Sequence, residues 1–120
     1  MTPVTEEALR ARLERGELVE GPAYATPAYV EALARTLIVS ADTELVSAPA
    51  YLRAARDAPS INSYISAVGI IQDELGHAHI AYRMLRDLGV DVDALVYERD
   101  PAQFKHPYAF DVPLETWTEL

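Results

Sequence analysis

The chain has 120 residues, of which 50% are hydrophobic and 24% are charged, as is usual for one soluble globular domain. It has no cysteine, which excludes disulfides, thiolate zinc sites and iron–sulfur clusters, so a metal would need carboxylate, imidazole, carbonyl or water ligands. The net charge of −9 disfavours nucleic acid as a partner. No apolar run approaches the roughly 20 residues that span a bilayer, and the first residues lack the features of a signal peptide. We therefore expect a cytoplasmic protein with no membrane segment.

Proline and glycine separate the segments that have helical periodicity. The sequence predicts helices at about 5–15, 27–47 and 60–88, and Thr5 and Thr26 are placed to cap the first two. Pro49 is expected to stop or kink the second helix. Pro113 and the helix-forming residues after it predict the start of a further helix at 113–120. The expected fold is a single all-α domain, residues 1–120.

Glu44, Glu74 and His77 continue the apolar stripes of the second and third helices. In the third helix, Glu74 and His77 form a Glu-x-x-His motif, whose two side chains point the same way one turn apart. A buried carboxylate without a partner is unfavourable, so these positions call for a metal, a base or a proton. The midpoint of Glu44 and Glu74 is Pro59, so an antiparallel helix pair would set the two acids side by side. Asp73 is predicted to support the site from behind by orienting a histidine on a neighbouring helix.

The predicted ligands, Glu44, Glu74 and His77, make up half of a ferritin-like two-metal site, which takes two such sets from four helices. The sequence therefore predicts a ferritin-like half-bundle, either the N-terminal half of a longer bundle or one partner of a dimer that completes it. Iron is the expected metal, with manganese as an alternative. A purely structural hydrogen-bonded pair of Glu74 and His77 stays open as another explanation. His79 and His106 are expected to lie outside the site.

Two segments resemble a known family of enzymes. Thr43-Glu44-Leu45-Val46 is similar to a first-helix ligand segment, and Gln72-Asp73-Glu74-Leu75-Gly76-His77-Ala78 to a second, within a match over about residues 28–90. These segments resemble the phenylacetate-degradation oxygenases, the A and C subunits of the multicomponent phenylacetyl-CoA ring 1,2-epoxidase. In that family the catalytic A subunit keeps its metal ligands and the C subunit has lost them. Because this chain keeps Glu44, Glu74 and His77, it resembles the catalytic A subunit.

The resemblance implies a di-iron centre that activates O2 and epoxidises an aromatic ring held as a CoA thioester. It also implies a separate NADPH-dependent reductase and assembly with a second ferritin-like subunit or a second copy. Family members are about twice as long as this chain, so the second ligand set is missing here. Two alternatives share the fold: a non-catalytic scaffold subunit, and a ferritin-like oxidase such as a ferroxidase or manganese catalase completed by dimerisation.

Overall fold

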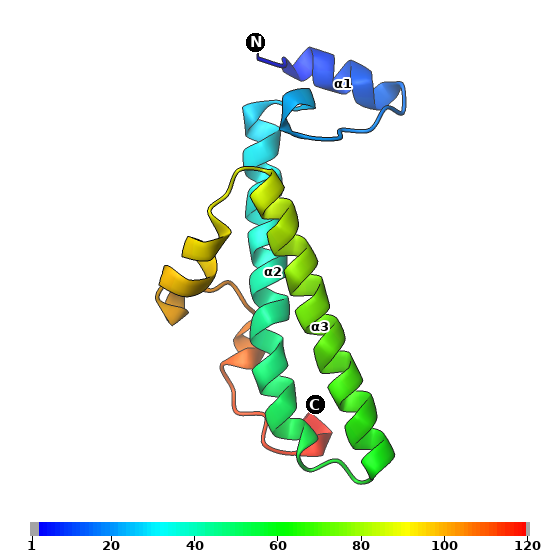
Figure 1. Ribbon diagram of the computed structural model, residues 1–120, viewed down its shortest axis with the longest axis vertical. Helices are drawn as coiled ribbons and strands as arrows, with labels where there is room; N and C mark the ends of the chain where they lie inside the picture. The colour runs from blue at the N-terminus through cyan, green and yellow to red at the C-terminus, as the bar shows by residue number, and fades with distance from the viewer. Residues whose placement is uncertain (1–2, 120) are drawn as a thin grey trace.

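The protein is built from helices and short helical turns, as a computed structural model of residues 3–119 describes it (Figure 1). Three α-helices span Glu6–Glu14 (α1), Pro27–Ala55 (α2) and Ile61–Asp87 (α3). Single turns lie at Pro22–Tyr24, Ala94–Glu98, Pro101–Gln103, Tyr108–Phe110 and Trp117–Glu119. The predicted all-α fold with a long helix pair is confirmed. Three residues of the predicted domain 1–120 lie outside the described residues, namely 1, 2 and 120. The last of these also belongs to the predicted helix at 113–120.

The long antiparallel pair of α2 and α3 dominates the molecule (Figure 1). α2 begins where the sequence predicts it, because the Thr26 hydroxyl accepts a hydrogen bond of 3.1 Å from the Tyr29 N–H. α3 is capped in the same way by Ser60. It ends before Gly89, whose φ of 85° is the left-handed conformation that glycine adopts readily. These ends place α3 within one residue of the predicted range.

The predicted end of the second helix near residue 47 is wrong. α2 continues through Pro49 to Ala55, although proline removes one backbone hydrogen bond. The extra turns bury Ala48, Ala54 and Ala55, and Ala48 and Ala55 join a core cluster with residues of α3. Tertiary packing of this kind outweighs a local helix-breaking preference.

The segment after α3 returns along α2 and forms short turns in place of a long helix (Figure 1). The expected helix at 113–120 is reduced to one turn, Trp117–Glu119. The Glu119 carboxylate accepts hydrogen bonds from the N–H groups of Glu115 and Thr116. These side-chain bonds, with Trp117 packed on the core, stabilise a local turn at the expense of a continuing helix.

Small side chains let α2 and α3 approach each other closely. The buried core is rich in alanine, including Ala41, Ala67, Ala78 and Ala81, with Leu85 fully buried among them. The molecule is long and thin, 58 × 32 × 21 Å, with a radius of gyration of 18.5 Å. A compact domain of this length has a radius of gyration of about 14 Å. None of the helices in residues 3–119 is long and apolar enough to cross a membrane.

Candidate metal centre

The antiparallel pair brings Glu44 of α2 together with Glu74 and His77 of α3. One ligand atom from each of the three residues lies within 4.8 Å of the others. The His77 Nδ1 and the Glu44 Oε2 are 3.6 Å apart. This is the arrangement expected from equal distances to the turn, and the unbroken helix through Pro49 preserves it.

The group lies at the edge of the helix pair, more open to solvent than the apolar stripe predicts. Glu44 and Glu74 are half-buried, whereas 60% of the His77 side chain is exposed. The buried side of α3 runs through Ala78 and Leu85, and His77 is rotated away from it. His77 lies on the predicted apolar stripe of α3, but α2 does not cover that part of the stripe.

The two carboxyl groups affect each other's protonation. The pKa of Glu74 is raised, first by its hydrogen bond with Glu44, then by partial burial and by the negative charge of Glu44. His77 acts in the opposite direction, and Asp73 adds to the rise. Two carboxylates can form such a bond only when they share a proton. A divalent cation can take the place of that proton, and carboxylate with imidazole is a donor set suited to iron or manganese.

Three other residues from the sequence analysis lie outside this group. Asp73 is exposed on α3, and its supporting role stays a prediction. His79 is exposed and lines a different cavity. His106 contacts the Asp111 Oδ1 at 2.7 Å, and this hydrogen bond raises the pKa of His106. The group of possible ligands found among the described residues consists of Glu44, Glu74 and His77.

Sequence reasoning missed a buried polar cluster around Asp42, which is 0% exposed. Its carboxylate accepts hydrogen bonds from the Tyr82 hydroxyl at 2.7 Å, from two Arg99 nitrogens at 2.7 and 2.8 Å, and from the Lys105 N–H at 2.9 Å. Burial acts to raise the pKa of Asp42, but these bonds outweigh it and hold the pKa below the ordinary 3.8. Arg99 also stacks on the Phe104 ring at 4.0 Å. The cluster fastens the C-terminal segment to both long helices.

No local signal in the sequence marks this cluster. Asp42 reads as a solvent-facing acid next to Ala41, and Arg99 lies 57 residues away in a segment without periodicity. The third partner, Lys105, donates its backbone N–H, which no side-chain pattern can reveal. Only the path of the C-terminal segment brings these groups together.

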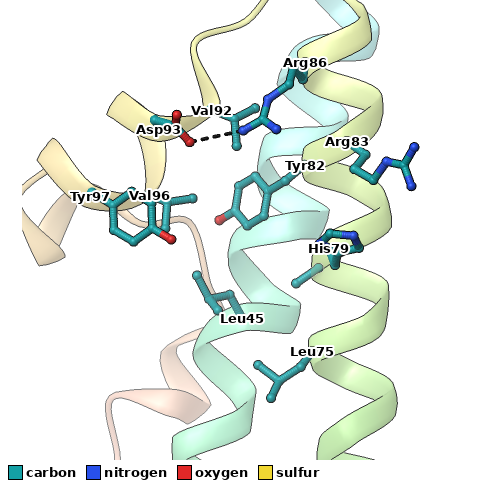
Figure 2. A pocket seen from close by; sticks show the side chains of 11 residues that line it. Leu45, Leu75, His79, Tyr82, Arg83, Arg86, Val92, Asp93, Val96 and Tyr97 are labelled. Atoms are coloured by element: carbon teal, nitrogen blue, oxygen red, sulfur yellow. Dashed lines mark hydrogen bonds and ion pairs between the residues drawn. The ribbon is translucent and has the colours of Figure 1, made fainter.

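A cavity of about 270 Å³ opens between α3 and the turn Ala94–Glu98 (Figure 2). Leu45, Leu75 and Ala78 line it, and each directly follows one of the three candidate ligands. Since successive helical residues are rotated by about 100°, this cavity lies on the adjoining faces of the helices and away from the metal group. A smaller apolar recess of about 180 Å³, lined by Tyr51, Ala67, Ile70 and Glu74, borders the group itself.

Comparison with protein families places the chain. The family model described as phenylacetic acid catabolic protein matches residues 5–120, a range that includes all three candidate ligands. Comparisons with curated proteins and with solved structures gave no match. The resemblance carried by the segments around Glu44 and Glu74 is confirmed. The chain belongs to the phenylacetic acid catabolic protein family, and its role lies in phenylacetate catabolism.

Proposed function

We propose that the chain is a subunit of a di-iron oxygenase of the phenylacetyl-CoA 1,2-epoxidase type. The observation that carries this proposal is the meeting of Glu44, Glu74 and His77, with ligand atoms within 4.8 Å of one another, in a chain of this family. These three residues would hold iron, with manganese as the alternative. The ion, when bound, supplies the activation of O2 and the stabilisation of developing charge.

The chain's own residues would bind the metal ions, orient the substrate ring and shield the reacting centre from water. Glu44 and Glu74 face each other from two helices and so fix the spacing of the metal ligands. The recess of Tyr51, Ala67 and Ile70 beside Glu74 offers an apolar site for an aromatic ring next to the metal group. An apolar wall there also keeps water from the reacting centre.

The ligand set in this chain is half of a ferritin-like set. The proposal therefore includes a second helix pair, from further sequence of the same protein, a second ferritin-like subunit or a second copy, which covers the open site. Electrons would come from a separate reductase component, and the assembly would work in the cytoplasm. The family membership supports a multicomponent complex.

The test combines metal content with turnover. The chain, assembled with its partner subunit and reductase, is supplied with Fe(II), NADPH, O2 and phenylacetyl-CoA, and the ring-epoxidised CoA thioester is measured by mass spectrometry. We expect iron retention and product with the wild type and neither with Glu74→Ala. Glu31→Ala, at an exposed glutamate of α2 that pairs with Arg35, is the matched control and should behave as wild type. Equal iron and product in Glu74→Ala would contradict the proposal.

A scaffold role is the second candidate, and it is favoured by the openness of the group, since 60% of the His77 side chain is exposed. A scaffold subunit would support turnover by its partner even when Glu44, Glu74 and His77 are all replaced by alanine. The same assay also separates a ferritin-like oxidase, which would consume O2 with iron alone and show no dependence on a CoA thioester.

A further inference from the structure

The cavity between α3 and the turn Ala94–Glu98 has apolar walls and one cationic edge (Figure 2). The aliphatic part of its walls comes from Leu45, Leu75, Ala78, Val92 and Val96. The cationic edge consists of His79, Arg83 and Arg86, at steps of four and three residues along one side of α3. Two arginines against the single aspartate of the lining, Asp93, make this edge positive in a chain whose net charge is −9. An apolar cavity with a positive edge suits an apolar molecule that carries one negative group.

Two tyrosines complete the apolar lining. The Tyr82 hydroxyl already donates to the Asp42 Oδ1 at 2.7 Å, so Tyr82 offers the cavity mainly its ring. Tyr97 lies across from it on the turn, and 81% of this residue is exposed (Figure 2). Aromatic and aliphatic side chains in this arrangement favour a flat apolar ligand, because rings stack on rings or meet them edge to face.

The cationic edge has hydrogen-bond donors to spare. The Arg86 Nη2 contacts the Asp93 Oδ1 at 3.1 Å, which uses one of the five N–H groups of this guanidinium. Arg83 makes no ion pair with a carboxylate of residues 3–119. Figure 2 shows its side chain extending from the outer side of α3, where an exposed side chain changes rotamer within nanoseconds. A carboxylate at this edge would therefore meet unused charged donors, which form the stronger class of hydrogen bond.

The size and place of the cavity separate it from the metal group. Its volume of about 270 Å³ lies just below the range of roughly 300–1,000 Å³ for pockets that hold drug-sized molecules. One ring with a short acidic arm suits this volume, whereas a whole CoA thioester does not. Leu75 and Ala78 are each rotated by about 100° from Glu74 and His77, so the ligand would not contact the metal.

We propose that this cavity is a binding site for a small aromatic carboxylate. The ring packs against Tyr82 and Tyr97, and the carboxylate accepts hydrogen bonds from Arg86 and Arg83. The bound acid joins α3 to the segment after it, in addition to the contact between Arg86 and Asp93. This site goes beyond the proposed function and requires no metal ion.

The test titrates phenylacetate, which is one aromatic ring with one carboxylate, into the isotope-labelled chain in EDTA. Backbone amide signals are followed by NMR, and we expect saturable shifts concentrated at residues 75–86 and 92–97. Phenylacetamide has the ring without the charge, and acetate has the charge without the ring. Each should bind at least about tenfold more weakly than phenylacetate. These two comparisons use the unaltered chain, so they do not depend on the folding of a variant.

Variants at the cationic edge test the anchoring residues. Arg86→Gln should weaken phenylacetate binding about tenfold. Asp93→Asn should tighten it about threefold, because it releases Arg86 from an exposed ion pair. Arg53→Gln, at an exposed arginine in the last turn of α2, is the matched control and should bind as wild type.

Three results would each overturn the proposed site. They are shifts that gather around Ile70 and Glu74 in place of the cavity, equal binding of phenylacetamide, and wild-type affinity in Arg86→Gln. Because EDTA is present throughout, none of these results bears on the proposed function.

Discussion

Asp42 and Glu44 lie two residues apart on α2, yet their surroundings differ in almost every respect. Asp42 is fully buried and accepts hydrogen bonds from a tyrosine, an arginine and a backbone N–H. Glu44 is 28% exposed and faces Glu74 and His77, which bring another carboxyl group and a largely exposed imidazole. Asp42 is surrounded by hydrogen-bond donors, whereas Glu44 faces a second carboxyl group.

The difference separates a structural role from a ligand-binding role. The Asp42 cluster is complete within the chain, so its hydrogen bonds contribute to folding and leave no coordination free. The open group with Glu44 has unused oxygen and nitrogen atoms, and it gains from an added cation.

The largest effect is expected from breaking the closed cluster. Asp42→Ala leaves the Arg99 guanidinium, only 14% exposed, without its carboxylate partner. We expect a loss of about 3–5 kcal/mol in the free energy of unfolding, measured by urea denaturation. Asp73→Ala, which removes an exposed acid from α3, should change it by about 0.5 kcal/mol or less. Equal losses in the two variants would contradict the structural role of Asp42.

Acid should weaken the same cluster. The pKa of Asp42 is below its ordinary 3.8 in the folded chain, so the unfolded state binds the proton more readily. The contribution of Asp42 is present above that ordinary value and is lost as the pH falls through the folded-state pKa. Urea titrations below about pH 4 should show this loss in wild type and a smaller one in Asp42→Ala.

The second-largest effect is the gain in stability expected when the group of Glu44, Glu74 and His77 binds a metal ion. Mn²⁺ at about 100 times its dissociation constant should stabilise the wild-type chain by about 2.7 kcal/mol. The gain should appear as a higher melting temperature in circular dichroism. Glu74→Gln should abolish the gain, since it removes one of the three ligands. Glu31→Gln should retain it, and a full gain in Glu74→Gln would place the metal elsewhere.

The contrast also marks what the sequence can and cannot predict. Glu44, Glu74 and His77 are recoverable because helical spacing and equal distance from a turn are local properties of two adjacent helices. Asp42 and Arg99 are not, because their contact depends on how an irregular segment 57 residues away returns along α2. The helix starts marked by Thr5 and Thr26 are predicted correctly.

The end of α2 at Ala55 is not recoverable from local signals, since packing beyond Pro49 overrides a proline. The exposure of His77 is missed for a related reason. A residue on an apolar stripe is buried only if some element covers that stripe. The sequence pattern shows which face is apolar, but which part of that face α2 covers follows from the packing of the pair.

A smaller effect is expected at the open group without metal. The pKa of Glu74 is raised in the folded chain, so its ionisation at neutral pH opposes folding. This penalty is absent below the ordinary 4.5 and develops as the pH rises through the folded-state pKa. Glu74→Gln in EDTA should therefore stabilise the chain at pH 7 by about 0.5 kcal/mol, the scale of a like-charge pair. If Glu74→Gln instead lowers the free energy of unfolding by more than about 1 kcal/mol, on the order of a lost buried hydrogen bond, Glu74 has a structural role.

The smallest effect is expected on the titration of His106. This residue follows Lys105, whose backbone N–H donates a hydrogen bond to Asp42. Its hydrogen bond with Asp111 raises the pKa of His106 above the ordinary 6.5. The contribution of this pair is complete below 6.5 and is lost as the pH rises through the folded-state pKa. An NMR titration should show the raised pKa in wild type and a value nearer 6.5 in Asp111→Asn. The Lys105 bond is to backbone, and Arg99 stays charged, so the same titration should leave the signals of the Asp42 cluster nearly unmoved. A matching shift at Tyr82 would show instead that the closed cluster depends on this loop.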